Sequence, residues 1–120
     1  MFYINYVIIN YIANMKYTIY QIPVPTTKEE ESIYCKYAFR RYESIKNDID
    51  INRYKEVYSS EINTKEFNNI ISVLEEIFKI FNLNHPKDFH GHSLSVSDIV
   101  KINDTYYYCD SFGWKEIKNI

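Results

Sequence analysis

The chain has 120 residues, a formal net charge of −2, 46% apolar and 25% charged residues. This length fits one domain with one hydrophobic core, and the composition is that of a globular chain rather than a disordered one. The slightly acidic balance argues against a protein that coats DNA or RNA nonspecifically, and no apolar stretch reaches the length of a membrane span.

Residues 2–13 are apolar, β-branched and aromatic, and Met15 follows them like a second, more ordinary protein start. We therefore expect residues 1–14 to be an N-terminal extension on a single domain that covers residues 15–120. Residues 16–22 alternate in the way of a β-strand, and Pro23 and Pro25 end the pattern.

One helix, either continuous or broken, is expected over residues 28–46. Thr27 and Glu30 have the spacing of a capping box, and apolar residues recur after them at roughly helical intervals. A polar, turn-rich stretch follows over 47–53, and residues 54–62 alternate well enough to form a second strand.

The strongest periodic signal predicts an amphipathic helix over residues 64–81. Asn63, with Glu66 three residues later, is the expected N-terminal cap. Its apolar stripe comprises Phe67, Ile70, Ile71, Leu74, Ile77, Phe78 and Phe81.

Two further strands are predicted over residues 95–102 and 105–111, because Asn103-Asp104 suits a tight hairpin connection. A short last strand is expected from Trp114. Together these elements predict an α+β fold, in which an antiparallel sheet of about four strands carries the 64–81 helix on one face.

A metal site is the first chemistry to consider, because His85, His90 and His92 lie within eight residues. Structural zinc sites combine four ligands in tight pairs, and here the second half of such a pattern is missing. We therefore expect neither a metal nor any other cofactor, with the histidines bonded to backbone or solvent.

Catalytic nucleophiles have little support in the sequence. Ser93, Ser95 and Ser97 alternate with apolar residues as in a half-buried strand, with the hydroxyls outward. Cys109 is surrounded by aromatic residues, a setting that raises the pKa of a thiol and makes it inert. We expect no enzyme; a metal-dependent or Ser/His-dependent hydrolase is the remaining catalytic alternative.

The two cysteines, Cys35 and Cys109, do not mark a secreted disulfide scaffold, so reduced thiols and a cytoplasmic location are expected. Tyrosine is unusually frequent, with 13 copies. Codon usage in an AT-rich genome and core packing account for part of this excess, and tyrosine also suits interfaces.

The segment FNLNHPKDFHGHSLSVSDIVKINDTYYYCDSFGWKEI resembles the YodL-like domain, whose pattern is SLSVSDVV, a short turn and YYCDSFGFKE. The similarity is specific over residues 82–117, and Trp114 stands where the family usually has Phe. The resemblance implies a protein of phages, plasmids or conjugative elements, and it implies no established catalytic activity.

The same motif also has a structural interpretation. Asp98 is placed to brace a turn, and Asp110 and Ser111 can bond backbone groups of the next one. Phe112 and Trp114, on either side of Gly113, are expected to anchor the last strand on the core.

These observations favour a non-enzymatic protein that binds and inhibits a host defence factor, such as a restriction or RNA-guided nuclease. The alternative is a small nucleic-acid-binding or regulatory module, which a one-sided basic face over residues 36–53 would favour. A host protein is the expected partner, and no membrane is. The binding-surface candidates are Arg40, Arg41, Tyr42, Ser95 and Tyr107.

Overall fold

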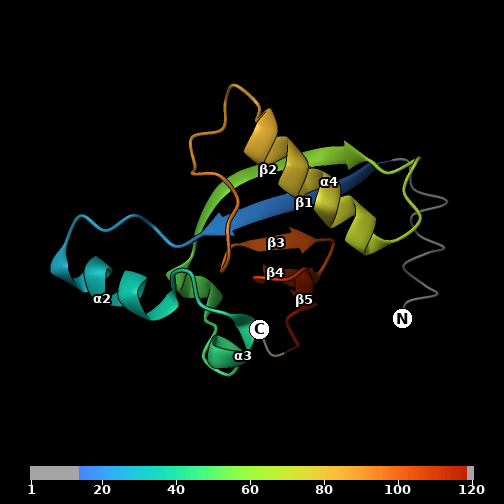
Figure 1. The fold of residues 1–120 in the computed structure, drawn as a ribbon. Helices are drawn as coiled ribbons and strands as arrows, with labels where there is room; N and C mark the ends of the chain where they lie inside the picture. Colours follow the sequence, from blue (N-terminus) through green and yellow to red (C-terminus); the bar gives the residue numbers. More distant parts are fainter. Residues whose placement is uncertain (1–13, 119–120) are drawn as a thin grey trace.

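The computed structural model describes residues 14–118, which form an α+β fold around one antiparallel sheet (Figure 1). The sheet has five strands in the order β2-β1-β3-β4-β5, where about four were expected. The strands are β1 (Asn14–Gln21), β2 (Lys55–Asn63), β3 (Ile99–Ile102), β4 (Thr105–Cys109) and β5 (Trp114–Glu116). The helices are α2 (Lys28–Tyr37), α3 (Tyr42–Ile45), the 3-10 turn η1 (Ile51–Arg53) and α4 (Ile70–Leu83).

Residues 1–13 of the expected N-terminal extension lie outside the described residues. Asn14 already belongs to β1, where it pairs with Asn63 of β2. Within residues 14–118, no helix is long and apolar enough to cross a membrane.

Strand β1 lies between β2 and β3, so it joins the edge strand to the C-terminal part of the sheet. Its register pairs Ile19 with Tyr58 and Tyr20 with Glu56, which leaves Val57 as the extra residue of a β-bulge. A bulge bends its strand and redirects the neighbouring side chains. Strand β2 is therefore kinked close to its N-terminal end.

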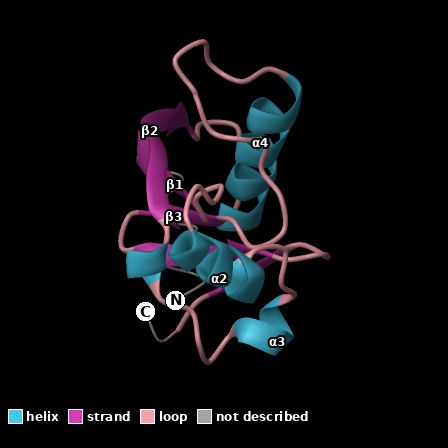
Figure 2. Cartoon of the chain, turned by 90° about the vertical axis from the view of Figure 1, so that its left-hand side faces the viewer, coloured by secondary structure: helices cyan, strands magenta, loops and turns pink. Residues whose placement is uncertain are grey.

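The alternation of β1, β3 and β4 sends buried side chains to both faces of the sheet. On one face, Tyr17, Val100 and Tyr107 share a hydrophobic cluster with the buried stripe of α4. On the other, Ile99 and Tyr108 share a second cluster with Tyr37, Ile45 and Tyr54 from the α2–η1 region. Figures 1 and 2 place α4 beside the strands in both views, apart from α2 and α3.

Helix α4 begins at Ile70, six residues later than the apolar spacing predicted. Its N-cap is Asn69, whose side chain accepts a hydrogen bond from the Ser72 N–H at 2.9 Å. The expected cap, Asn63, instead accepts from the Lys65 N–H in the preceding turn, at 2.9 Å. Phe67 lies in that turn and still packs against the core, so its place in the sequence matched the spacing of a buried helical residue.

The expected helix over 28–46 is divided into α2 and α3. Thr27 caps α2 as predicted, since its hydroxyl accepts from the Glu30 N–H at 3.1 Å. The Glu30 carboxylate accepts from the N–H and hydroxyl of Thr26, and these bonds lower the pKa of Glu30. The break lies at residues 38–41, where Phe39 has a φ of +58°.

Strand β3 begins at Ile99 rather than at residue 95. Ser97 has a φ of +87°, and the Asp98 N–H donates to the Ser95 carbonyl in a turn. The predicted outward row of serine hydroxyls is therefore wrong, and Ser97 is 3% exposed. The Asn103-Asp104 hairpin is confirmed, with Asn103 at a φ of +56°.

Candidate functional site

Residues 39–42 run from the break after α2 into the first residue of α3. They lie against the C-terminal motif of residues 82–117, although the bonded residues are 58 to 68 positions apart in sequence. Three side chains of the motif, from the turn before β3, from β4 and from the residue after β4, each bind one backbone group of this segment. The Ser97 hydroxyl accepts from the Phe39 N–H at 3.0 Å, the Tyr108 hydroxyl donates to the Arg40 carbonyl, and the Asp110 carboxylate accepts from the Tyr42 N–H at 3.0 Å.

These three bonds fix a backbone that is unfavourable by itself. A bulky side chain at a positive φ is uncommon, because Cβ crowds the neighbouring carbonyl oxygen. Phe39 adopts this conformation and is 57% exposed, and its ring makes an edge contact with Tyr34 at 6.0 Å between centroids. Such strain persists where the surroundings over-determine it, and it is frequent at functional sites.

The side chains presented by this segment are aromatic and cationic. Arg40 folds back on the last turn of α2 and donates to the carbonyls of Cys35 and Lys36. Arg41 is exposed, and its carbonyl accepts from the N–H and the hydroxyl of Ser44, whereas its guanidinium makes no hydrogen bond or ion pair within residues 14–118. Tyr42 is half-buried, and its hydroxyl donates to the Glu116 carbonyl at 3.3 Å.

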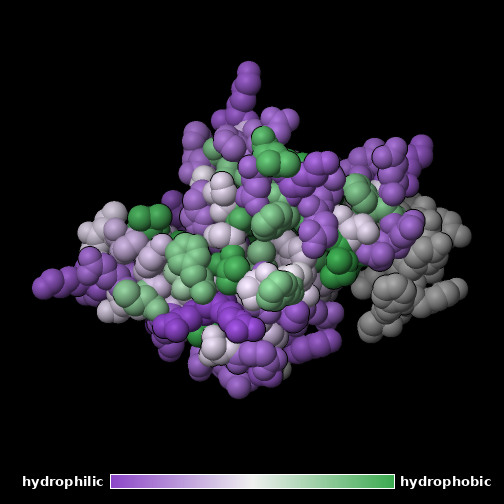
Figure 3. Space-filling model, viewed as in Figure 1, coloured by the Kyte–Doolittle hydropathy of each residue, from purple (hydrophilic) through white to green (hydrophobic). Residues whose placement is uncertain are grey.

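The turn between β4 and β5 adds a second exposed aromatic ring. Phe112 is 83% exposed, so the expectation that it anchors the last strand is wrong, whereas Trp114 is 8% exposed and packs near Phe78. Gly113 has a φ of +74°, which this turn requires and which glycine adopts without strain. The face turned to the viewer in Figure 3 carries hydrophobic groups, set among hydrophilic ones, between α2 and β5.

We define the presenting surface as Phe39, Arg40, Arg41, Tyr42 and Phe112. Aromatic residues and arginine are the types in which binding energy concentrates at protein interfaces. Three of the sequence candidates, Arg40, Arg41 and Tyr42, belong to this surface.

Tyr107 and Ser95, the other two sequence candidates, are less exposed than a binding surface requires. Tyr107 is 4% exposed and belongs to the cluster under α4, so the expectation that it lies on a binding surface is wrong. Both faces of β4 are covered, and alternation along one strand cannot reveal this. Ser95 is half-buried, and its hydroxyl is buried without a hydrogen-bond partner.

The basic residues of the 36–53 region are paired separately with different groups. Lys46 contacts Glu43 at 3.0 Å, Arg53 contacts Asp50 at 3.8 Å, and Lys36 lies 5.2 Å from the ring centre of Tyr37. Together with the capping role of Arg40, this pairing leaves a mixed surface, with Arg41 as its free cation. Two of these cations, Lys46 and Arg53, are therefore paired with carboxylates, and Lys36, Arg40 and Arg41 are not.

A second cluster joins β1 to the loop before β3. The Asp98 carboxylate is 2% exposed and accepts from the Gln21 side chain and from the Ser95 N–H, each at 3.0 Å. His92 Nδ1 lies 3.9 Å from the same oxygen. Burial raises the pKa of Asp98 to about 7, against the lowering by these partners. The predicted bracing role of Asp98 corresponds to these bonds.

The remaining motif residues and histidines have local partners. Asp110 also accepts from the Ser111 N–H at 2.9 Å. His85 Nδ1 is 2.8 Å from the Pro86 carbonyl oxygen, and His92 Nδ1 is 2.7 Å from that of Ser93. Within residues 14–118, no three side chains of His, Cys, Asp or Glu are placed to share a metal ion.

The nucleophile candidates of the sequence were Cys109 and the serines at positions 93, 95 and 97. Burial raises the pKa of the Cys109 thiol to about 12, as its aromatic surroundings predicted. Between residues 14 and 118, no serine or cysteine side chain is hydrogen-bonded to a histidine ring. Ser97 holds the Phe39 backbone with its hydroxyl instead.

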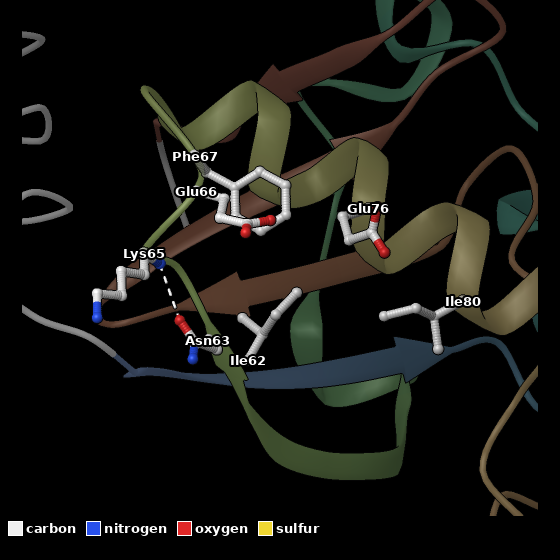
Figure 4. A pocket seen from close by; sticks show the side chains of 7 residues that line it. All are labelled: Ile62, Asn63, Lys65, Glu66, Phe67, Glu76 and Ile80. Carbon is white, nitrogen blue, oxygen red and sulfur yellow. Dashed lines mark hydrogen bonds between the residues drawn. The ribbon is translucent and has the colours of Figure 1, made fainter.

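An open groove of about 410 Å³ lies between the end of β2 and α4 (Figure 4). Ile62 and Ile80 point into it from opposite elements, and Glu66 and Glu76 stand above them. The side chains that line the groove come from the end of β2, the turn after it and α4, and none belongs to the C-terminal motif.

The sequence did not predict that Ser97 and Tyr108 bind the backbone around Phe39, because a positive φ at phenylalanine has no local sequence signal. Gln21 did carry a signal. It follows Tyr17 and Ile19 on the inward side of β1, where a polar residue needs a buried partner. The structure supplies that partner in Asp98.

The family model of the YodL-like domain matches residues 16–120. The chain belongs to the YodL-like domain family. No curated protein and no solved structure matches it significantly. The motif that carries the resemblance thus supplies all three side chains that fix segment 39–42, as well as Phe112 of the presenting surface. In this YodL-like domain the motif holds segment 39–42 in place and contributes one exposed ring of its own.

Proposed function

We propose that this YodL-like protein acts by binding a partner protein through the presenting surface, without catalysing a reaction. The observation that carries the proposal is the fixation of the Phe39, Arg40 and Tyr42 backbone groups by Ser97, Tyr108 and Asp110. A rigid, already ordered contact surface loses less conformational entropy on association than a flexible one. A fixed segment that exposes an aromatic ring and a free arginine therefore fits a binding role.

The class of partner that we propose is a host defence factor, such as a restriction or RNA-guided nuclease. This part of the proposal rests on the mobile-element context that the family resemblance implies. The alternative, a nucleic-acid-binding or regulatory module, has less support, because Lys46 and Arg53 are paired with carboxylates and the net charge is −2.

The experiment expresses the protein in bacteria that carry a defined restriction or RNA-guided system and measures the plating efficiency of a targeted phage. The wild type should raise plating, and the Arg41→Ala/Phe112→Ala variant should lose most of this effect. Leu83→Ala removes another side chain that is 77% exposed, at the far end of α4, and should behave like the wild type.

Purified components then separate binding from catalysis. A binder should inhibit its target stoichiometrically, with saturation near one inhibitor per target. If a small fraction of an equivalent inactivates the whole target pool with time, the protein turns over and the non-enzymatic proposal is wrong. Equal loss of activity in Leu83→Ala would show that the presenting surface is not the contact.

A further inference from the structure

An open pocket of about 450 Å³ lies where the end of β1, the start of β2 and the loop before β3 meet. All three ionisable side chains that line it are basic: Lys55, His90 and His92. No aspartate or glutamate among the described residues lines it, although acidic residues outnumber lysine and arginine in the chain by 16 to 14. The pocket therefore combines the charge of Lys55 with two imidazole rings and no carboxylate, in an acidic protein.

The floor of this pocket is rigid. Gln21 is 2% exposed, donates to the His92 carbonyl at 2.8 Å and accepts from the His92 N–H at 3.2 Å. Asp98 lies behind this pair and does not line the pocket. Gly91 allows the close approach, because a Cβ there would stand 2.5 Å from the Gln21 side-chain oxygen.

The wall opposite the histidines comes partly from β2. Lys55 and Val57 lie two positions apart on this strand and both line the pocket, and the β-bulge at Val57 lies at the pocket wall. Ile22, Pro23 and Val24 complete an apolar wall from the end of β1, and Val24 is 68% exposed. Bulges that redirect side chains are over-represented beside functional sites.

We propose that this pocket binds a phosphate monoester that carries an apolar or aromatic group. Lys55, His90 and His92 supply donors to the phosphate oxygens, and charge-assisted bonds of this kind are the strong ones. The wall of Ile22, Val24 and Val57 covers the apolar group. The site shares no residue with the presenting surface, so it stands independently of the proposed partner binding.

The test is a titration of the full chain, followed by NMR amide shifts, at pH 6.5 and low ionic strength. Three probes separate the contributions: phenyl phosphate, inorganic phosphate and phenol. Phenyl phosphate should bind more tightly than either of the others, and the largest shifts should fall on residues 21–24, 55–57 and 90–92.

Two variants and two matched controls locate the site. Lys55→Ala and His90→Ala should each weaken phenyl phosphate binding by roughly fivefold, the effect of one charge-assisted bond at a partly exposed site. Lys87→Ala and His85→Ala remove the same side-chain types from outside the pocket and should stay within about twofold of the wild type. All four positions are exposed, and an unchanged melting temperature verifies that each variant is folded.

Three results would overturn the assignment. Phenyl phosphate could fail to bind at tens of millimolar, it could bind no better than inorganic phosphate or phenol, or it could bind equally well to the Lys55→Ala and His90→Ala variants. Shifts confined to the pocket residues, together with the loss in these two variants only, would establish the site.

Discussion

Phe39 offers a direct test of the idea that the presenting surface is held in a strained conformation. Its φ of +58° costs a residue with a Cβ about 1–2 kcal/mol, and glycine is spared this cost. Phe39→Ala and Phe39→Gly both remove the ring and its contact with Tyr34, so the two variants differ mainly in the backbone.

The expected order of stability follows from two opposing effects. Glycine loses more backbone entropy on folding, so at an ordinary position it is less stable than alanine by about 0.4–1 kcal/mol. At Phe39 the relief of strain exceeds this loss, so Phe39→Gly should be more stable than Phe39→Ala by about 0.5–1 kcal/mol. For a domain of this size the difference corresponds to roughly 2–5 °C in melting temperature.

The assay is urea unfolding at 25 °C, followed by far-UV circular dichroism. Phe112 provides the control pair, because it is also exposed but its φ is not positive. Phe112→Ala should be at least as stable as Phe112→Gly, the usual order. If Phe39→Gly is less stable than Phe39→Ala, the backbone at this position is not strained and the reasoning fails.

Three further predictions concern buried groups. Because burial raises the pKa of Asp98 to about 7, folding takes up a proton between about pH 4 and pH 7, and the associated stability is lost as pH rises through this range. In urea unfolding, the free energy of unfolding of Asp98→Asn relative to that of the wild type should therefore rise by about 1 kcal/mol or more from pH 4 to pH 8. A difference that stays constant with pH would contradict this. Tyr108→Phe should cost about 1 kcal/mol through the lost bond to the Arg40 carbonyl, and should weaken partner binding although Tyr108 is fully buried; unchanged binding would remove its positioning role. A thiol reagent should modify Cys35 quickly in the native protein and Cys109 only after unfolding, and two fast thiols per chain would refute the burial of Cys109.

The sequence determined much of the local structure of this protein. Thr27 caps α2, Asn103 turns the β3–β4 hairpin, and Leu74, Ile77 and Phe81 of the predicted stripe are buried in α4, because each feature depends on residues close together in the chain. Ile71 of the same stripe is 46% exposed, which the spacing did not predict. Even here the position of a boundary was open, since Asn63 and Asn69 both suit a cap. The α+β class followed from the order of these local elements.

Only the tertiary structure decided which faces are covered and which side chains cooperate. Alternation separates Tyr107 from Tyr106 and Tyr108, but it cannot show that β4 is covered on both faces. Phe112 and Trp114 flank the same glycine, yet one is exposed and the other buried, according to where the β4–β5 turn leaves the sheet. The presenting surface depends on hydrogen bonds across 58 to 68 residues, from Ser97, Tyr108 and Asp110 to segment 39–42. Contacts at such separations are fixed by the packing of the whole sheet, and no local pattern of residues encodes them.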